Sequence, residues 1–590
     1  MGSTEKPDHD LEAVPDADQS VDRRGFMRSA LATAALAGIP ASLTAQGTGT
    51  GGAGRGQPEA PPPRPLGNGE PPAMVFQPYP GGTGSYLEKL ARERGREAFE
   101  RARFTVEGFR GPVPTSEEEL AFLPAHRLAA LIQSRKISSV QITDIYLNRL
   151  KRLDPQLLCA VSILEGQARE AAQQADAEIR AGRYRGPLHG IPYGIKDLFA
   201  VRGTKTTWGS KAHADQVIDV DSEVYIRLRD AGAVLIAKLA TGLFAQGDQW
   251  YRGQTKNPWN LAQGASGSSA GPGSATAAGC VAFGIGTETQ GSIVSPTIRN
   301  GLSALRPTFG RVSRYGGMVL AWSMDKVGPM CRTIEDCAMV FNTIHGADEK
   351  DPATVTAPFR FERKVDWSKL RIGYDESTGP NAAPAAVVAK LRELGAQLKP
   401  IPARPNSQGI SGLGVEGAAA FDSYLATLPP QYVDSVLAAS GRRGGGAPGA
   451  ATPGGTPGAA TPDSGRRGGG GGRGPAGDDS PGSAVTRFGR GRTTTALDYM
   501  QAQRRRYILI HEMAALMKDF DMYLTGSGDV GLTNQTGHPA VVFPYRMSDG
   551  ANSQPVCTTI IGGLFADDTI LSVAHAYQKA TNWHEQHPKL

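Results

Sequence analysis

The sequence predicts an α/β protein with a mixed, twisted β-sheet between helical layers. Two apolar segments of strand length, residues 233–237 and 281–285, alternate with segments of helical period. Capping-box patterns begin at Ser116 and Ser138, and an alanine-rich stretch predicts a further helix over 165–179. This alternation of strands and helices is typical of domains in which helices cover a sheet. We therefore expect a layered fold of the α/β class.

The length and composition exclude several classes of protein. The chain has 590 residues and a mean hydropathy of −0.30, and a chain of this size forms a large core without disulfide or metal staples. It has no run of about 18 apolar residues, which excludes a polytopic membrane protein. Its five cysteines include no Cys-x-x-Cys pair, which excludes a cysteine-based zinc ribbon and a thioredoxin-type redox site. We expect no metal and no cofactor.

The positive charge of the chain is concentrated in residues 441–492. The net charge of the chain is +6, and eight arginines and three aspartates in this segment contribute +5 of it. The segment also holds 19 of the 75 glycines, and such a composition buries too little apolar area to offset the entropy of ordering. We interpret it as a disordered insertion. Binding of a polyanion is a second interpretation, but Phe488 is its only aromatic residue for stacking, so we expect no nucleic-acid partner.

The N-terminus has the pattern of an export signal. Arg23 and Arg24 precede a short alanine-rich apolar run, which is typical of twin-arginine (Tat) signal peptides. A chance arginine pair in an acidic tail is the alternative interpretation. We predict a signal peptide over 1–45, a linker and N-terminal extension over 46–110, and one folded domain over 111–590. The protein would meet the Tat machinery in transit, keep no integral membrane anchor after signal removal, and be periplasmic or secreted.

A stretch rich in glycine and serine is the first candidate for a catalytic site. Gly267 and Gly271 flank Ser268 and Ser269, which permits a sharp turn of the backbone. Pro272 suits the first turn of a helix. Ser268 would then lie just before a helix N-terminus, in its positive potential.

A second loop follows the strand predicted near residues 281–286. It comprises Thr289, Gln290, Gly291 and Ser292. Successive backbone N–H groups in a tight loop between a strand and a helix can hold an oxyanion. Ser295 and Pro296 are typical of an N-cap and a first helical residue. This arrangement makes Ser292, at the end of the loop, a candidate nucleophile.

A serine nucleophile needs a base, and Lys196 is the candidate. It ends an apolar run, residues 190–195, that would carry it into a core. Desolvation would lower the pKa of the amine and leave it neutral, so that it accepts a proton. The alternative interpretation is a surface lysine that closes a strand and pairs with Asp197.

These motifs resemble those of the amidase signature family of hydrolases. The resemblance runs from about residue 115 to 345 and from about 495 to 585. It includes the segments around Lys196, Ser268 and Ser292. Further matching segments are residues 186–192, 206–210, 232–238, 305–313, 325–329 and 534–539.

The resemblance implies a fold, an activity and roles for individual residues. It implies that the enzyme hydrolyses a carboxylic amide to an acid and an amine or ammonia, without a cofactor. Lys196 corresponds to the base, Ser268 to a bridging serine after a cis peptide bond, and Ser292 to the acylated nucleophile. The N–H groups of Thr289, Gln290, Gly291 and Ser292 correspond to the oxyanion hole. Ser269 and Gly267 would have supporting roles.

The chain departs from the family pattern at three informative positions. Gln290 replaces a glycine in the oxyanion loop, and Glu288 replaces the more common aspartate. Val294 replaces the usual arginine two residues after the nucleophile, so the role of that charge would pass to another residue, for which Arg299 is a candidate.

Two other enzyme classes match parts of the sequence. The first is a protein like the A subunit of an amidotransferase, which would hydrolyse glutamine with a partner, although export argues against a cytoplasmic partner and tRNA. The second is an α/β-hydrolase, because residues 267–271 also match Gly-x-Ser-x-Gly. That motif requires a strand directly before it, and residues 259–263 do not have the sequence pattern of a strand.

Overall fold

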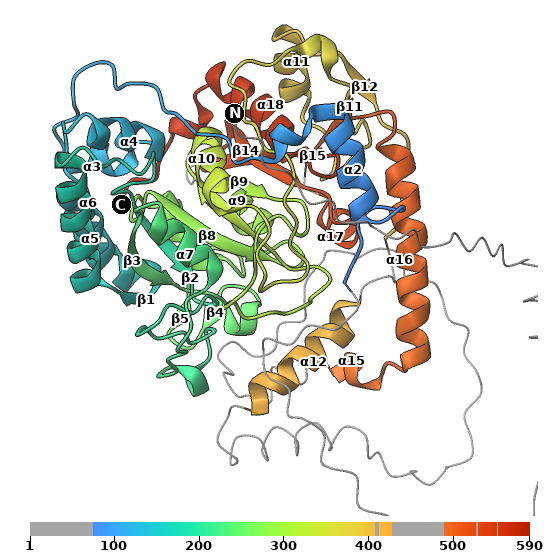
Figure 1. The fold of residues 1–590 in the computed structure, drawn as a ribbon, viewed down its shortest axis with the longest axis horizontal. Coiled ribbons are helices and arrows are strands. Elements are labelled where there is room, and N and C mark those ends of the chain that lie inside the picture. Colours follow the sequence, from blue (N-terminus) through green and yellow to red (C-terminus); the bar gives the residue numbers. More distant parts are fainter. Residues whose placement is uncertain (1–74, 408–411, 427–488, 527–528, 551–552) are drawn as a thin grey trace, which may run out of the picture. The chain divides into compact units, whose positions relative to one another are not determined.

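An eleven-stranded mixed sheet forms the centre of the molecule (Figure 1). The computed structural model describes residues 75–407, 412–426, 489–526, 529–550 and 553–590. The strand order is β1-β3-β2-β8-β10-β9-β14-β15-β13-β11-β12. Strand β2 is parallel to β3 and β8, and β11 is parallel to β12 and β13, whereas the remaining neighbours are antiparallel. The predicted α/β class with a mixed sheet is confirmed.

The shortest strands of the central sheet are β11 and β12, and the longest are β14 and β15. Their bounds are β1 (Ala160–Ile163), β2 (Pro192–Lys196), β3 (Val234–Leu239), β8 (Phe283–Glu288), β9 (Ser303–Arg306), β10 (Lys326–Cys331), β11 (Ile372–Tyr374), β12 (Leu398–Pro400), β13 (Met522–Thr525), β14 (Ala540–Met547) and β15 (Pro555–Gly562). Two small hairpins lie outside this sheet, β4 (Gln249–Trp250) with β5 (Gly253–Gln254) and β6 (Lys256–Asn257) with β7 (Asn260–Gly264).

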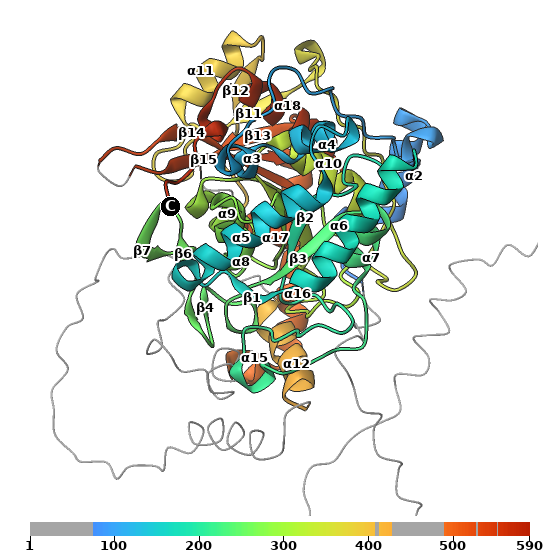
Figure 2. The same ribbon diagram turned by 90° about the vertical axis from the view of Figure 1, so that its left-hand side faces the viewer.

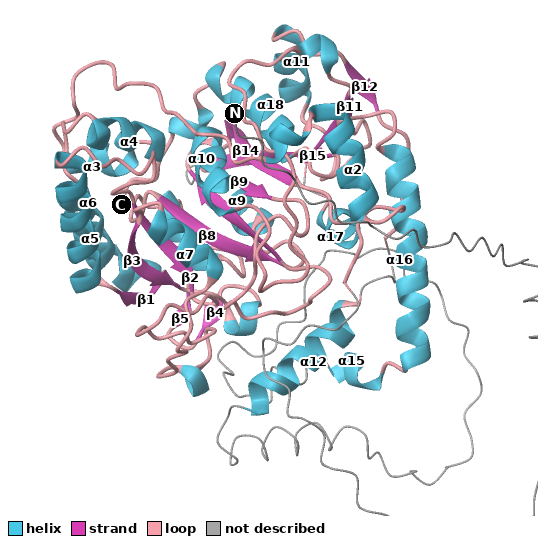
Figure 3. Cartoon of the chain, in the orientation of Figure 1, coloured by secondary structure: helices cyan, strands magenta, loops and turns pink. Residues whose placement is uncertain are grey.

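The helices surround this sheet (Figure 3). Their bounds are α2 (Thr83–Arg94), α3 (Glu117–Phe122), α4 (Ala125–Gln133), α5 (Ser139–Leu157), α6 (Glu165–Arg180), α7 (Glu223–Asp230), α8 (Ala270–Ala277), α9 (Val294–Asn300), α10 (Ile334–Ile344), α11 (Ala385–Glu393), α12 (Leu413–Ala426), α15 (Gly489–Thr493), α16 (Ala496–Leu516), α17 (Val530–Thr536) and α18 (Asp567–Lys579).

Strand β10 shows that helices cover both faces of the sheet. Successive side chains of a strand point to opposite faces. Met330 lies against Gly273 of α8, whereas the thiol of the next residue, Cys331, contacts that of Cys337 in α10. Helices α8 and α10 therefore pack on opposite sides of β10. Figure 2 shows α5 and α6 in front of β2 and β3 when the molecule is turned by 90°.

The predicted helix starts agree with the structure where a local cap determines them. Ser116 forms the complete capping box of α3 with Glu119, and the Ser138 side chain accepts the N–H of Gln141 at the start of α5. The alanine-rich helix is α6, which ends one residue beyond the predicted Ile179. Strand β8 begins two residues later than predicted and continues to Glu288. This shift carries the strand directly into the candidate oxyanion loop.

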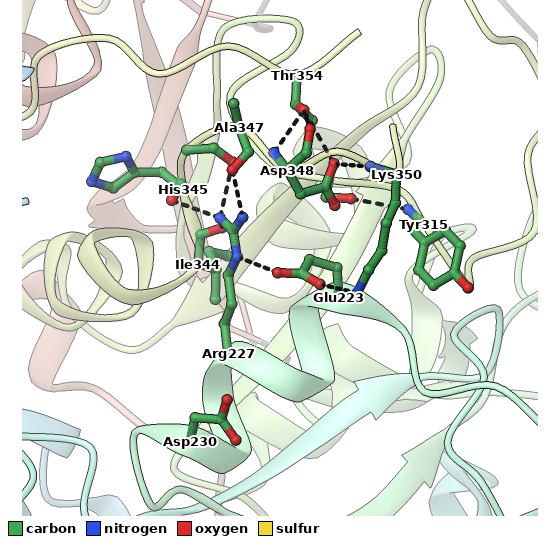
Figure 4. A network of polar contacts seen from close by, with 12 residues as sticks. Glu223, Arg227, Asp230, Tyr315, Ile344, His345, Ala347, Asp348, Lys350 and Thr354 are labelled. Carbon is green, nitrogen blue, oxygen red and sulfur yellow. Dashed lines mark hydrogen bonds and ion pairs between the residues drawn. The ribbon is translucent and has the colours of Figure 1, made fainter. Parts of the chain in front are cut away.

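A salt-bridge network joins α7 to the segment that follows α10 (Figure 4). The guanidinium group of Arg227 donates to the carbonyl oxygens of residues 344–347 at 2.7–3.0 Å. Glu223 accepts from Arg227 and from Lys350, both at 2.9 Å. A cation at a helix C-terminus satisfies orphan carbonyls and matches the helix dipole. Arg227 thus fixes the end of α10 against α7.

The N-terminal extension contains structure that the sequence did not predict. Helix α2 and a short 3-10 helix over Arg96–Phe99 lie within the segment predicted as linker and extension. Arg94 forms an ion pair of 2.7 Å with Asp568, and the Tyr86 hydroxyl donates to the carbonyl of Leu564. These contacts attach the extension to the C-terminal part of the chain.

Three predictions fall mainly outside the described residues. The predicted signal peptide, 1–45, lies outside them, as does the start of the linker. The predicted insertion, 441–492, also lies outside them except for residues 489–492, which belong to helix α15. Within the part of the chain that is described, no helix has both the length and the apolar character needed to span a membrane.

Candidate active site

Lys196 is the last residue of β2, in the N-terminal half of the sheet, and its side chain is fully buried. Its Nζ atom lies 2.8 Å from Ser268 Oγ, 3.1 Å from Ser269 Oγ and 2.8 Å from Thr287 Oγ1. Desolvation by burial holds the pKa of Lys196 well below its usual range, against the opposing effect of two nearby carboxylates. The site thus favours a neutral amine.

Three hydroxyl contacts suit a neutral amine, which has two N–H donors and one lone pair. The hydroxyl of Ser269 donates to the Thr287 carbonyl and accepts the Thr287 N–H, both at 3.1 Å. Because its only hydrogen is used there, Ser269 can only accept from Lys196. Ser268 Oγ also accepts from the Lys196 amine at 2.8 Å, and its own hydrogen donates to no other group among the described residues.

The surface-lysine interpretation of Lys196 is wrong. Asp197, the partner it required, forms a buried salt bridge of 2.9 Å with Lys238. The other carboxylate oxygen of Asp197 accepts from the backbone and the hydroxyl of Thr207. Asp197 therefore ties β2 to β3 and to the segment after β2.

The peptide bond between Gly267 and Ser268 is cis, as predicted. Gly267 is required for space, since a Cβ atom there would overlap the carbonyl oxygen of Gly247. Helix α8 begins at Ala270, so Pro272 lies in its first turn. Ser268 thus lies just before the N-terminus of α8, as the sequence predicted.

The nucleophile elbow is a poor description of this turn. The expectation that residues 259–263 form no strand is wrong, because β7 spans Asn260–Gly264, but β7 pairs with β6 and lies outside the central sheet. Ser269, the serine of that motif, is fully buried, and its hydroxyl is held by Thr287 and Lys196. Ser269 therefore lacks the exposed hydroxyl that a nucleophile elbow presents.

Ser292 lies at the end of the loop that follows β8, and it is half-buried. Its carbonyl accepts the N–H of Ser269 at 3.2 Å, which holds the two serine segments side by side. Between the described hydroxyls of Ser268 and Ser292 there is no direct hydrogen bond. Lys196 and Ser268 are buried, whereas Ser292 is partly accessible.

The loop before Ser292 presents unpaired N–H groups. Gly291 has φ +94°, which turns the backbone in a way that favours glycine. Within the described residues, the N–H groups of Gln290, Gly291 and Ser292 donate no hydrogen bond to the chain. Such a group of free N–H donors is suited to an oxyanion. Gln290, the departure from the usual glycine, is exposed, so its side chain points to solvent.

The helix after Ser292 begins earlier than predicted. Ser295 and Pro296 are not its N-cap and first residue, because α9 starts at Val294. The cap comes from Glu288, whose Oε2 atom accepts the N–H groups of Ile293 at 2.8 Å and Val294 at 2.9 Å. A carboxylate at a helix N-terminus is favoured by the orphan N–H groups and the helix dipole.

Arg306 provides the charge that balances Glu288. Its Nη1 atom lies 3.3 Å from Glu288 Oε1, and both side chains are fully buried. Arg299, the candidate to take over the role of the arginine usually found at position 294, is exposed and donates to Gln263. Burial raises the pKa of the Glu288 carboxyl, but Arg306 and the neighbouring donors outweigh burial and hold that pKa below its usual value.

Asn534 extends this buried network to α17. Its Nδ2 atom donates to Glu288 Oε1 at 2.7 Å, and its Oδ1 atom accepts from Lys326 Nζ at 2.9 Å. The sequence marked Asn534 only as part of a matching segment. Its partners come from β8 and β10, so no local pattern identifies them.

Asp325, like Asn534, was marked in the sequence only as part of a matching segment. Its carboxylate accepts from Thr289 Oγ1 at 2.5 Å and from the N–H groups of Leu320 at 2.7 Å and Ala321 at 3.2 Å. Asp325 therefore connects the candidate oxyanion loop to the segment that precedes β10. Among the described residues, no group of three or more His, Cys, Asp or Glu side chains is placed to hold a metal.

Comparisons with known proteins identify the family of the chain. A profile of the Amidase family matches residues 141–441. The A subunit of the glutamyl-tRNA(Gln) amidotransferase of Methylococcus capsulatus is 32% identical over 497 residues, covering 78% of this chain and 97% of that protein. The same protein of Roseiflexus sp. is 33% identical over 487 residues, covering 77% and 96%.

A solved structure shows the same relationship. The peptide amidase of Stenotrophomonas maltophilia superposes with a TM-score of 0.62 at 26% sequence identity, covering 78% of this chain and 97% of that one. The likeness therefore extends over nearly the whole length of that enzyme. This chain belongs to the amidase signature family, and it is a hydrolase that acts on carbon–nitrogen amide bonds.

Proposed function

We propose that the enzyme hydrolyses a carboxylic amide through Lys196, Ser268 and Ser292. Neutral Lys196 accepts a proton from Ser268 as Ser268 accepts one from Ser292. The Ser292 oxygen attacks the amide carbonyl, and Ser268 returns a proton to the leaving nitrogen, because an amide anion is a very poor leaving group. Water then attacks the acyl-enzyme by the same relay, which releases the acid and restores Ser292.

The loop over residues 289–292 would stabilise the transition state. Its N–H groups carry partial positive charge toward the position where the carbonyl oxygen becomes an oxyanion, and one such donor typically contributes about 3 kcal/mol. Support comes from the free N–H groups of Gln290, Gly291 and Ser292. The observation that carries the proposal is the buried Lys196 amine, 2.8 Å from the Ser268 hydroxyl.

The test is amide turnover by matched variants. Ser292→Ala and Lys196→Met are each expected to lower kcat by at least about a thousandfold, because the parts of such a relay act as a unit. A fluorophosphonate probe should label the wild type and not Ser292→Ala. Labelling that survives in Ser292→Ala, or turnover that survives in Lys196→Met, would refute these assignments.

A second candidate is glutamine hydrolysis in an amidotransferase-like assembly. The observation that favours it is the 30–33% identity to the A subunits of glutamyl-tRNA(Gln) amidotransferases. Release of ammonia from L-glutamine, measured with the purified chain, separates it from a free-standing amidase. Glutamine as the best of a panel of amides would support it, and turnover of other amides with no glutaminase activity would exclude it.

We also propose that the chain is exported by the Tat route. Support comes from the Arg23–Arg24 motif and from the five cysteines, which are all buried free thiols. Free cysteines suit a protein that folds in the reducing cytoplasm before export. Fractionation of cells that produce the wild type and an Arg23→Lys/Arg24→Lys variant tests this. Equal amounts of the wild type and of the variant outside the inner membrane would contradict export by the Tat route.

A further inference from the structure

Helix α16 packs one face on the molecule and leaves the opposite face open to solvent. On the packed face, the buried Arg506 donates to the carbonyl of Gln535 at 2.7 Å, and its apolar neighbours join a core cluster. The helix lies at the edge of the described structure (Figure 1). The large apolar side chains of its open face are 48–67% exposed, and they are Leu497, Met500, Tyr507 and Ile508. We call these four residues the α16 patch.

The α16 patch is the main concentration of exposed apolar groups in the described part of the chain. Seven large apolar side chains are exposed there, and four of them belong to this patch. A surface hollow of about 510 Å³ runs from Met500 to Ile508, and the described residues that line it all belong to α16. The Tyr507 ring contacts that of His511 at a centroid distance of 4.5 Å, which limits the freedom of the Tyr507 side chain. Exposed apolar groups gathered in this way mark an interaction site.

The exposed arginines and acidic residues of α16 balance one another in charge. They are Asp498, Arg504, Arg505 and Glu512. Asp498 accepts from Thr495 in the helix cap, and Arg504 donates to Gln501 at 3.0 Å. Arg505 and Glu512 form no hydrogen bond or ion pair with any described residue. An anionic lipid surface would attract Arg505 and repel Glu512, so this face suits a partner that presents charges of both signs.

A second copy of the same helix presents those charges in matching places. Arg505, Ile508 and Glu512 are spaced by three and four residues, so they lie along one face of α16. Along the helix axis, Arg505 lies about 4.5 Å before Ile508 and Glu512 about 6 Å after it. An antiparallel copy related by a two-fold axis at Ile508 would therefore place each Arg505 beside the partner's Glu512, with an axial offset of about 1.5 Å. A parallel copy would instead place like charges together.

We infer that the α16 patch is the interface between two antiparallel copies of this chain, related by a two-fold axis beside Ile508. Tyr507 and Ile508 lie at the centre of this interface and the two pairs of Arg505 with Glu512 at its rim, which is the usual distribution of apolar and charged groups. Both copies use the same surface, so the contact closes into a dimer and does not continue into a filament. Removal of the patch from water provides the attraction, and the charge pairs determine the orientation.

The test is the dissociation constant of the dimer, measured by sedimentation velocity over a wide range of concentrations of the full chain. The wild type is expected to sediment as a species of twice the mass of the chain, which is 62.2 kDa. Arg505→Glu and Glu512→Arg should each raise the dissociation constant at least about tenfold, because each replaces two ion pairs by two contacts between like charges. The double variant Arg505→Glu/Glu512→Arg restores opposite charges and should return to within about threefold of the wild type.

Ile508→Glu should make the chain monomeric, because it places two carboxylates together at the two-fold axis. Val217→Glu is the matched control, since Val217 is as exposed as Ile508, at 56%, and lies outside α16, and it should leave the dimer unchanged. Thermal unfolding checks that each variant is folded, and the two charge reversals decide the question if Ile508→Glu does not fold.

Three results would overturn the inference. The first is a wild type that stays monomeric at every concentration, including one that instead sediments with phosphatidylglycerol vesicles. The second is a dimer that is unaffected by the single charge reversals. The third is a double variant that stays as weak as the single reversals, because Arg505 and Glu512 would then not face each other across the interface.

Discussion

Replacing Glu288 by Gln should strongly destabilise the fold around the nucleophile. The two carboxylate oxygens of Glu288 accept from four groups, namely Arg306 and Asn534 on one oxygen and the N–H groups of Ile293 and Val294 on the other. A glutamine amide has one oxygen, so two of these donors would face an NH₂ group. Each buried donor left without an acceptor costs about 1–3 kcal/mol. The Arg306 charge would also remain buried without its partner, so we expect a total loss of about 3–5 kcal/mol.

A double-mutant cycle measures this coupling. The free energy of unfolding is obtained from urea titrations of the wild type, Glu288→Gln, Arg306→Met and the double variant. Arg306→Met alone leaves Glu288 buried as an unpaired anion and should cost a similar amount. The double variant should be more stable than the sum of the single changes predicts, by at least about 1 kcal/mol. Additive effects, or a loss below about 1 kcal/mol for Glu288→Gln, would refute the network as described.

The pH dependence gives an independent check on Glu288. The pKa of this carboxyl is lowered in the folded protein, so its stabilising effect is present above the unfolded pKa of about 4.3 and is lost as the pH falls through the folded pKa. The difference in stability between the wild type and Glu288→Gln should therefore shrink below about pH 4. A difference that stays constant into the acid range would contradict the assignment of the charge.

Further predictions concern the base, its supports and the turn before Ser268. The pKa of Lys196 is lowered, so kcat/KM should rise with pH as the amine loses its proton. In Arg306→Met the unbalanced charge of Glu288 should raise the pKa of Lys196, so the pH profile of kcat/KM should move to higher pH. Coincident profiles of the two proteins would contradict this. Ser269→Ala removes a hydroxyl that holds the Lys196 amine in position, so it should lower kcat about 10- to 100-fold with little change in KM. A change in KM of the same size would instead indicate a role in substrate binding. Gly267→Ala should lower the free energy of unfolding, measured by urea titration, by about 1–3 kcal/mol, because the added methyl group overlaps the Gly247 carbonyl. An unchanged free energy would show that the backbone of the turn moves to accommodate the methyl group.

Local sequence patterns predicted those features that depend on local interactions. The starts of α3 and α5 followed from Ser116 and Ser138, because each cap lies within three residues of the N–H group it accepts. The apolar run before Lys196 left a buried base and a surface lysine as alternatives, and the structure confirms the buried position. The turn at Gly267 followed from the requirement for residues without a side chain. In each case the residues that determine the feature lie close to it in the sequence.

Features that depend on distant residues were missed or misplaced. The start of α9 was assigned to Ser295, because a typical cap residue was present and the real cap, Glu288, lies five residues before the first N–H it binds. Arg306 and Asn534 reach Glu288 from β9 and α17, and only the strand order brings them together. The ring contact of Trp208 with Tyr424 likewise joins residues that lie far apart in the sequence. Such pairings depend on the assembled sheet and not on spacing.

The ion pair of Glu288 and the neutrality of Lys196 are two parts of one arrangement. Glu288 and Asp325 are the two carboxylates that raise the pKa of Lys196, and an anion near an amine favours its charged form. The same carboxylates are needed, one to cap the helix after Ser292 and the other to hold Thr289. Arg306 balances the first of them, and burial raises the pKa of the second. The Arg306 charge weakens the negative field of Glu288 at Lys196. The lysine base tolerates two nearby carboxylates because the burial of its own amine outweighs their effect and because Arg306 offsets the charge of Glu288. A change at Arg306, with no contact to the base, should therefore still alter the pH at which the base works.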